Sequence, residues 1–487
     1  MKMKQCAKNA TEYLFHLLLL IIFWGGMLRF GFNADSLWHM VVSDADVTTR
    51  LTHGRYLIAL LDRILLAFDI RTTDSVVISM AITLGMFALA MLVVQKIIVD
   101  NLTTDSKTRY LVMLAMDFWA INVLFSEILM FSEFCVYSAM AYLFGALAVY
   151  FYAKRKYWLT IAFIIFAVCT YQYSVIFAAL LVTFYLCIRS ECKLSVKVVI
   201  EEVICVFVCL FMGFLNLIST DILSNMGVIA KVGKQAGTGD IADKFDKMGE
   251  SFLAIMKHSY SMMPVNWIPA IVWILVLTIL IIGLVSKREK NKIPYILILI
   301  FVSILIMYII PFVGEQFFFP PRMAFTFFLL IGFLFAYGIF ELEGKCRAAL
   351  TVLLIGFLVI NLVCVQKIIG NRFVTNALDE IYAQMIDDRI TDYEEQTGIQ
   401  VTKIARAYDE YAPFHYSEVN MAYEQINESA AYSAVTSLMK VMTNRDMEAV
   451  DMNPDVYEEY FFGRDWNHFN LDEQVIIVDD TIYWCLY

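Results

Sequence analysis

Charged residues are scarce in this sequence. Asp, Glu, Lys and Arg together make up 17% of its 487 residues, whereas 60% of the residues are hydrophobic. A soluble protein has about 25% charged residues and a smaller apolar fraction. This scarcity of charge excludes an ordinary soluble enzyme and predicts an integral membrane protein.

Several signatures of familiar chemistry are also missing. The six His residues form no HExxH pattern, and no Gly-rich nucleotide-binding fingerprint occurs. The last quarter of the chain contains a single Cys, Cys485, which cannot build a disulfide framework. These absences argue against coupling to ATP and against a C-terminal domain held together by disulfides.

The apolar residues gather in runs long enough to cross the roughly 30 Å of bilayer hydrocarbon, which takes about 20 helical residues. The fifth and sixth runs are short and are predicted to form a hairpin that turns at Tyr171-Gln172-Tyr173. We therefore expect an α-helical polytopic membrane protein with about eleven transmembrane helices, near residues 11–31, 75–95, 109–127, 133–152, 157–171, 173–188, 197–219, 266–286, 293–313, 323–341 and 348–366.

The links between these runs alternate in charge. Every second link is short and basic, beginning with Lys2, Lys4 and Lys8 before the first run. Basic links stay in the cytoplasm, so the N-terminus is expected inside and the C-terminal part outside. The first run continues to about Phe32 without a cleavage pattern, which predicts an uncleaved first helix.

Charge also divides the chain into two expected domains. Residues 1–366 contain the expected spans and have a small net positive charge, whereas residues 367–487 have far more acidic than basic residues. The second region is predicted to be a small α+β extracytoplasmic domain. Its elements are expected near 374–396 (a helix ending at Gly398), 401–408 (a strand), 428–442 (a helix) and a final strand pair. Its acidity argues against a nucleic-acid partner.

Two of the outer links are long, at residues 33–74 and 219–265. Carboxylates beside a membrane can act as general bases, and arginines there can hold a phosphate. A solvated loop kept out of lipid by its charges is the alternative. Residues 57–68 repeat apolar side chains at helical spacing, which predicts a helix lying in the membrane interface. The first link is rich in ionisable residues, namely Asp35, His39, Asp44, Asp46, Arg50, His53, Arg55 and Asp62.

Other polar residues allow two interpretations each. A divalent cation at Asp44 and Asp46 stays an alternative, but two carboxylates do not supply the six or more oxygens that such an ion needs. Asp117 lies within an expected span and is either functional or, as we favour, paired with a neighbouring helix. Glu315 and Arg322 flank an aromatic link stiffened by two prolines. There Arg322 either reaches a phosphate or anchors the chain at the interface.

The first outer link resembles the start of the GtrII-like bacterial glucosyltransferases. Acidic residues follow the first span, and the pair Gly54-Arg55 opens an amphipathic helix. The pair Tyr171-Gln172 and the C-terminal α+β domain entered by a helix are also similar to that family. Where the family has an adjacent acidic pair, this chain has Asn33-Ala34-Asp35 and the separated Asp44 and Asp46.

The resemblance implies a GT-C-like membrane hexosyltransferase in the bacterial inner membrane. Its donor would be a polyprenyl-phosphate sugar, with glucose expected, and its acceptor a surface glycan; no cofactor is implied. The candidate catalytic residues are Asp35, Asp44 and Asp46, with Asp35 or Asp44 as the base. Two alternatives stay open: a flippase of lipid-linked glycans, and a membrane-anchored sensory or structural protein. The substrate-binding candidates are His39, Arg50, Arg55, Gln172, Glu315 and Arg322.

Overall fold

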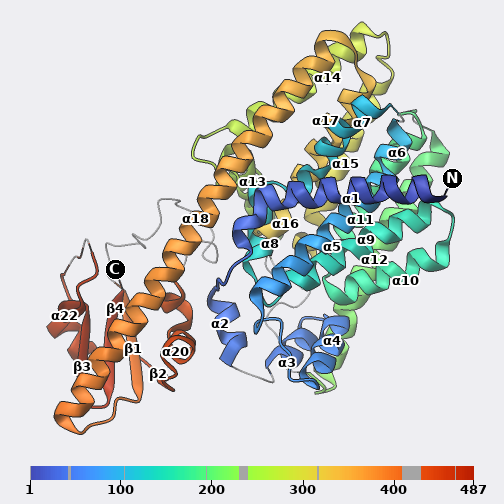
Figure 1. Ribbon diagram of the computed structural model, residues 1–487. Helices are drawn as coiled ribbons and strands as arrows, with labels where there is room; N and C mark the ends of the chain where they lie inside the picture. Colours follow the sequence, from blue (N-terminus) through green and yellow to red (C-terminus); the bar gives the residue numbers. More distant parts are fainter. Residues whose placement is uncertain are drawn as a thin grey trace.

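The computed structural model describes residues 2–41, 45–103, 105–193, 195–229, 240–314, 317–408, 429–464, 466 and 468–486. Helices account for most of these residues, and a four-stranded sheet lies near the C-terminus (Figure 1). The first helices are α1 (Lys2–Trp24), η1 (Gly25–Met27), α2 (Ala34–Val41), α3 (Ala45–Thr52), α4 (Tyr56–Leu66), α5 (Val76–Ile97), α6 (Val99–Leu102), α7 (Ser106–Met116), η2 (Asp117–Ala120), η3 (Val123–Phe125), α8 (Ser126–Met130) and α9 (Cys135–Ala153). They are followed by α10 (Tyr157–Thr170), α11 (Ser174–Arg189), α12 (Val196–Asn225), α13 (Ile241–His258), α14 (Ile268–Ser286), α15 (Lys292–Val313), α16 (Pro321–Ala324), α17 (Thr326–Glu341) and α18 (Gly344–Thr397).

The predicted class of polytopic helical membrane protein is confirmed, but with fewer full-length spans than eleven. Among the described residues, eight helices are long and apolar enough to cross a membrane, or nine if a bent pair is one span. The two helices of the expected hairpin, α10 and α11, are apolar but have only 14 and 16 residues. Neither reaches the length of about 20 residues that a full crossing needs.

The third expected span is broken rather than straight. Its two halves, Thr108–Ala120 and Val123–Met130, meet at 44°. Asn122 lies at the break, where its Nδ2 donates to Phe118 O (2.9 Å) and Trp119 O (2.8 Å) and its Oδ1 accepts from Leu124 N (3.0 Å). A broken helix is tolerated at membrane depth only where protein groups satisfy the freed backbone. Because of this break, α8 points in a different direction from α7.

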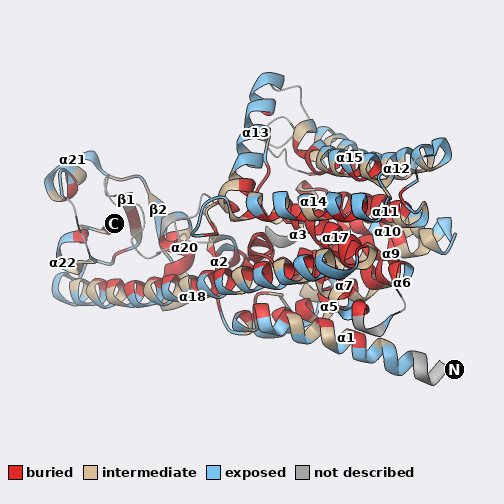
Figure 2. Ribbon diagram, turned by 90° about the horizontal axis from the view of Figure 1, so that it is seen from above, coloured by how far each residue is buried: buried red, intermediate tan, exposed pale blue. Residues whose placement is uncertain are grey.

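The interior of the bundle is built around α17. Every residue from Thr326 to Ile339 is buried, and Figure 2 shows this helix in the enclosed centre. Gly332 allows a close approach, because a Cβ there would lie 2.5 Å from the carbonyl oxygen of Ala115. In contrast, α12 buries only three of its 30 residues, so most of its surface is free to face lipid.

Asp117 is paired with a neighbouring helix, as the sequence analysis favours. Its Oδ2 lies 2.7 Å from Nδ1 of His16 on α1, and Nε2 of His16 lies 2.8 Å from Oε1 of Gln95 on α5. All three side chains are buried. This chain of polar contacts joins three helices, which is the use of intramembrane polar groups that stabilises a bundle.

The predicted helix in the first outer link is α4, and its apolar stripe points away from the protein. Leu60 and Ile64 are 56% and 47% exposed, whereas Asp62 is buried. The Asp62 carboxylate accepts a hydrogen bond from the Tyr137 hydroxyl and lies 3.5 Å from Nε of Arg50. A helix with exposed apolar side chains on one side and a buried carboxylate on the other fits the predicted position in the membrane interface.

The last expected span and the first helix of the C-terminal region are one uninterrupted helix, α18. Its 54 residues extend about 80 Å at 1.5 Å per residue, far more than a bilayer requires. The helix ends at Gly398, whose φ of 72° confirms the predicted C-cap. Figure 1 shows the sheet beside the C-terminal part of α18, at the end of the molecule opposite to the start of α1.

The C-terminal sheet contains the three predicted strands and one more. The strand order is β2-β1-β4-β3, with β1 parallel to both neighbours and β3 antiparallel to β4. The additional strand β2 has three residues, too few to show an alternating pattern. The elements are β1 (Lys403–Tyr408), α20 (Ala430–Thr443), β2 (Glu448–Val450), α21 (Pro454–Val456), η4 (Tyr457–Phe461), α22 (Leu471–Gln474), β3 (Val475–Val478) and β4 (Thr481–Leu486).

The first outer link contributes to the core of this C-terminal region. Phe32 lies just before α2, and Leu37 lies within it. Both are buried in one apolar cluster with Ile386, Leu438 and Trp484. Packing of α2 against α20 thus joins segments about 400 residues apart in the sequence. The helix that holds Asp35 and His39 is therefore positioned by the C-terminal region.

Asp379 on α18 fixes α20 by capping its N-terminus. The carboxylate accepts from Ala430 N (2.7 Å) and from the Ser429 hydroxyl, and the side chain is fully buried. We expect Asp379→Ala to lower the opening free energy of α20 by about 2 kcal/mol, because its orphan N–H groups lose a charged acceptor. Hydrogen exchange of the α20 amides, measured by mass spectrometry, should then quicken about 30-fold.

The matched control is Glu380→Ala, since Glu380 is the exposed neighbour of Asp379. We expect no change in α20 exchange from that variant. Equal exchange in the two variants would contradict a capping role for Asp379.

Candidate functional site

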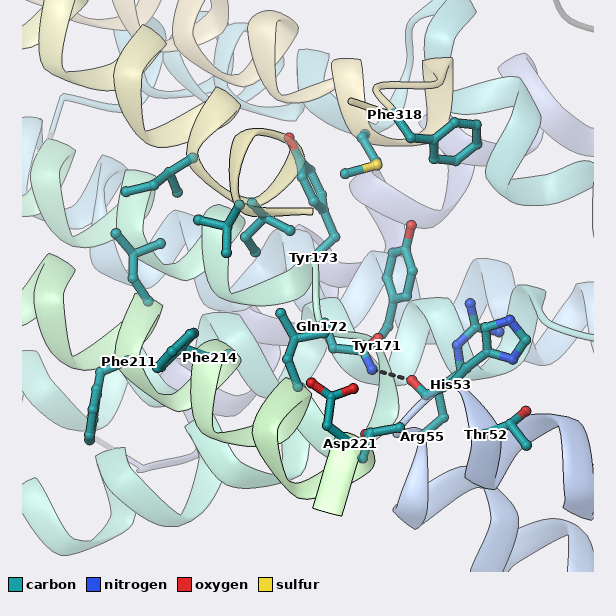
Figure 3. A pocket seen from close by; sticks show the side chains of 18 of the residues that line it. Thr52, His53, Arg55, Tyr171, Gln172, Tyr173, Phe211, Phe214, Asp221 and Phe318 are labelled. Atoms are coloured by element: carbon teal, nitrogen blue, oxygen red, sulfur yellow. Dashed lines mark hydrogen bonds between the residues drawn. The ribbon is translucent and has the colours of Figure 1, made fainter. Parts of the chain in front are cut away.

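A cavity of about 480 Å³ lies where the first outer link meets the α10–α11 turn, α12 and the end of α15 (Figure 3). Polar and aromatic side chains of the first link, of residues 171–173, of the segment before α17 and of the end of α12 line it, namely Thr52, His53, Arg55, Tyr171, Gln172, Tyr173, Phe318, Arg322, Thr220, Asp221 and Ser224. Its apolar wall comes from α12 and α15, through Phe207, Leu210, Phe211, Phe214, Leu217, Ile309, Ile310 and Val313.

Gly54 brings the first link into close contact with the cavity wall. Its φ is +69°, and an added Cβ would lie 2.6 Å from both Asn216 Oδ1 and Thr220 Oγ1. Only glycine fits here, because both the backbone conformation and the space exclude a side chain. The Gly54 carbonyl accepts from Asn216 Nδ2 (2.9 Å), and the His53 carbonyl accepts from the Gln172 amide.

Arg55 follows this glycine and lines the cavity. Its Cζ lies 4.3 Å from the ring centroid of Phe134 and 5.7 Å from that of Tyr171. Its Nε is shielded from solvent without a hydrogen-bond partner, and no carboxylate among the described residues pairs with it. Burial, aided by the positive charge of Arg50, lowers the pKa of the Arg55 guanidinium. A bound anion would supply the missing negative charge.

Arg322 is the second cation of the cavity, and it is paired. Oε2 of the fully buried Glu127 accepts from the Arg322 backbone N–H (2.6 Å), and Oε1 accepts from its guanidinium. The guanidinium also lies over the rings of Phe131 and Phe318, at 5.2 and 5.4 Å. Because the third span is bent, α8 is oriented so that Glu127 contacts this arginine.

The wall formed by α12 changes character along its length. The side chains facing the cavity are apolar from Phe207 to Leu217 and polar from Thr220 to Ser224. These 18 residues cover about 27 Å of helix. Tyr56, next to Arg55, bonds the hydroxyls of Ser219 (2.9 Å) and Thr220 (3.0 Å). Arg55 therefore lies level with the boundary between the apolar and the polar end.

The structure brings together three of the predicted substrate-binding residues. Arg55, Gln172 and Arg322 come from segments far apart in the sequence and line the same cavity. The Gln172 amide nitrogen is engaged within the protein, since it also donates to Asn216 Oδ1 (3.0 Å). The Gln172 amide group therefore lines the cavity and also holds the neighbouring segments in place.

Other predicted site residues lie outside the cavity lining. Arg50 is buried and committed to Asp62 and to the Glu133 carbonyl oxygen (3.1 Å). His39 is buried on α2, and Asp35 is exposed on the same helix. Ser36, the residue after Asp35, donates its hydroxyl to Glu133 Oε2 (2.8 Å), so the start of α2 lies beside the turn before α9. Asp44 and Glu315 lie outside the described residues, as does the side chain of Asp46.

A family model described as glucosyl transferase GtrII matches residues 28–339, which include the whole cavity. The chain belongs to the GtrII glucosyltransferase family. It is a glycosyltransferase with several membrane-length apolar helices. No curated protein and no solved structure shows significant similarity to it. Family membership favours the enzyme over the flippase and sensory alternatives.

The GtrII-family site contains carboxylates that the sequence analysis did not select. Asp221 lines the cavity from the last turns of α12, although residue 219 was expected to end that span. The available signal was spacing, since Phe214, Leu217, Asp221 and Ser224 continue one helical stripe. Glu133 lies beside α2, where its Oε2 accepts from the Ser36 hydroxyl (2.8 Å); burial raises its pKa.

The described part of this GtrII-family chain has no group of three or more His, Cys, Asp or Glu side chains placed to hold a metal ion. Glu127, beside the cavity, is instead paired with Arg322. Positive charge for an anionic substrate therefore comes from Arg55 and Arg322 among the described residues.

The Glu127–Arg322 pair gives a stability test. The variant Glu127→Ala leaves a buried guanidinium without its carboxylate. We therefore expect it to lower the free energy of unfolding by about 3–5 kcal/mol. The double variant Glu127→Leu/Arg322→Met should recover most of this loss, since it removes both charges and keeps the volume. Unfolding midpoints in detergent measure both effects, and an equal loss in the single and double variants would count against a buried pair.

Proposed function

We propose that the chain transfers a sugar, with glucose as the expected one, from a polyprenyl-phosphate donor to a surface glycan outside the cytoplasm. The observation that carries this proposal is Arg55, a cation without a carboxylate partner among the described residues, placed where a cavity changes from apolar to polar. A lipid phosphate needs this combination of a charge and an adjoining apolar surface.

The shape and chemistry of the cavity suit an amphipathic donor. A polyprenyl-phosphate sugar has an apolar tail, a charged phosphate and a polar sugar in that order. The cavity offers the apolar face of α12 and α15, then Arg55 and Arg322, then the polar end of α12. The tail thus meets an apolar surface, the phosphate meets arginines and the sugar meets polar side chains.

The apolar end continues into a second cavity between the same two helices. This cavity of about 310 Å³ shares Phe207 and Leu210 with the first and is otherwise lined mainly by aliphatic side chains of α12 and α15. Few residues of α12 are buried in the protein, so lipid can reach the groove from the side. We propose that the polyprenyl tail enters here, without crossing a polar surface.

In the proposed mechanism, the acceptor hydroxyl attacks the anomeric carbon of the sugar as the bond to the phosphate oxygen breaks. The proton of the hydroxyl passes to a carboxylate of the first outer link, with Asp35 as our leading candidate because it is exposed at the start of α2. Negative charge grows on the departing phosphate, and Arg55 and Arg322 stabilise it. No nucleotide takes part.

The proposed location is the bacterial inner membrane, with the N-terminus in the cytoplasm. The basic links support this orientation. The sheet and the start of α1 lie at opposite ends of the molecule, as an inside N-terminus and an outside C-terminal region require (Figure 1). The packing of α2 against the C-terminal region supports a role for that region in holding the acceptor beside Asp35.

Arg55 gives the first test of this function. We expect Arg55→Ala to weaken binding of polyprenyl phosphate by about 100-fold, because the phosphate loses a charge-assisted hydrogen bond. Transfer from polyprenyl-phosphate glucose should fall with it. The control is Arg63→Ala, which removes an exposed arginine from the same helix α4. Unchanged lipid binding in Arg55→Ala would refute the phosphate site.

The catalytic carboxylate has a separate test. We expect Asp35→Asn to reduce kcat about 10²- to 10⁴-fold, the usual contribution of a general base, with little change in donor binding. Asp44→Asn and Asp46→Asn, assayed in parallel, show which first-link carboxylate acts. If all three variants transfer glucose at the wild-type rate, the base lies elsewhere.

A further inference from the structure

The polar end of the cavity contains a carboxylate that the proposed phosphate chemistry does not use. Asp221 lies on the last turns of α12, and Figure 3 shows its carboxylate directed into the cavity. No ion pair or hydrogen bond of this carboxylate is found within the described part of the chain. A carboxylate in such a place is available to a ligand.

A second unused polar group lies one turn further along the same helix. The Ser224 hydroxyl oxygen is shielded from solvent and has no hydrogen-bond partner among the described residues. Buried polar atoms in proteins are nearly always bonded, so an orphan hydroxyl lining a cavity points to a missing ligand. Asp221 and Ser224 are three residues apart, which places them on one face of the helix.

These groups have the hydrogen-bonding capacity that a sugar requires. A carboxylate accepts hydrogen bonds from hydroxyl groups, and a serine hydroxyl both donates and accepts. Thr52 and His53 also line the cavity, as do Tyr171 and Phe318, whose rings offer flat apolar surface. A hexose combines several hydroxyl groups with apolar C–H faces, so it matches this lining better than an alkyl chain or a bare phosphate does.

The position of these groups relative to Arg55 agrees with the order of parts in the donor. Hydrogen bonds of Gly54 and Tyr56 place the Arg55 loop against residues 216–220 of α12. Asp221 and Ser224 lie just beyond that level, on the side away from the apolar wall. A sugar attached to a phosphate held by Arg55 reaches them without moving the tail.

We propose that Asp221 and Ser224 form the subsite for the transferred sugar and determine which hexose the enzyme accepts. This inference rests on the proposed function, since it takes the phosphate position from Arg55. Asp221 acts by binding sugar hydroxyl groups, and the proton of the acceptor goes to a different carboxylate. A site built to bond a hydroxyl discriminates strongly against an analogue that lacks it.

The test measures binding of two lipids to the full-length protein: polyprenyl-phosphate glucose and polyprenyl phosphate without a sugar. We expect Asp221→Ala to weaken binding of the glucose lipid by about 10- to 100-fold, the usual effect of losing a hydrogen bond to a charged group. Binding of the sugar-free lipid should not change. Ser224→Ala should show the same selectivity with a smaller loss, and Asp243→Asn, on the exposed surface of α13, should affect neither lipid.

Donors that contain deoxyglucose provide the specific readout. The wild-type protein should discriminate against the analogue that lacks the hydroxyl bonded by Asp221. In Asp221→Ala that single preference should disappear while preferences at the other positions remain. A merely structural role for Asp221 would change all of them alike.

The outcomes separate this inference from the proposed function. If the wild-type protein binds neither lipid, the proposed donor is wrong. If it binds both lipids and Asp221→Ala binds them with unchanged affinities, the sugar subsite is wrong and the phosphate site stands. A variant Asp221→Asn that binds the glucose lipid normally but no longer transfers glucose would make Asp221 the base and overturn the subsite.

Discussion

The carboxamides of Gln172 and Asn216 hold the backbone of residues 53 and 54, and the arrangement of the cavity depends on these contacts. One amide comes from a turn between two short helices and the other from α12. Backbone groups near a bilayer must find partners within the protein, because lipid offers none. With these bonds made, the chain can leave its helical path at Gly54 and still present Arg55 to the cavity.

The same junction explains how one helix can serve both the lipid and the protein. Tyr56 and Gly54 fix α12 near residues 216–220, and α12 packs against α11 and α10 on one side while few of its residues are fully buried. This packing leaves the α15 side of α12 open as an apolar groove. The polar contacts at residues 216–220 and the apolar groove beside α15 therefore result from the same packing. Together they place the charge of Arg55 at the edge of a lipid-accessible surface.

Distant parts of the chain also meet around α2. The uninterrupted helix α18 connects the membrane bundle to the C-terminal sheet, and the apolar cluster around Leu37 brings α2 back to it. Ser36 and Glu133 join the other face of α2 to the turn before α9. Helix α2, which contains Asp35, is therefore held by contacts on two of its faces. The position of this carboxylate thus depends on the C-terminal region.

The sequence by itself determined the membrane class, most helix positions and the C-terminal strands, and it predicted Arg55, Gln172 and Arg322 as separate substrate-binding candidates. These features follow from hydropathy, helical periodicity, turn residues and motifs, which are local in the chain. Only the tertiary structure decided that Arg322 is paired with Glu127 while Arg55 has no such partner, that Arg50 is committed to Asp62, and that Asp221 faces the cavity. The reason is physical: whether a charge is available to a ligand depends on which side chains pack around it, and packing joins residues that no local pattern relates.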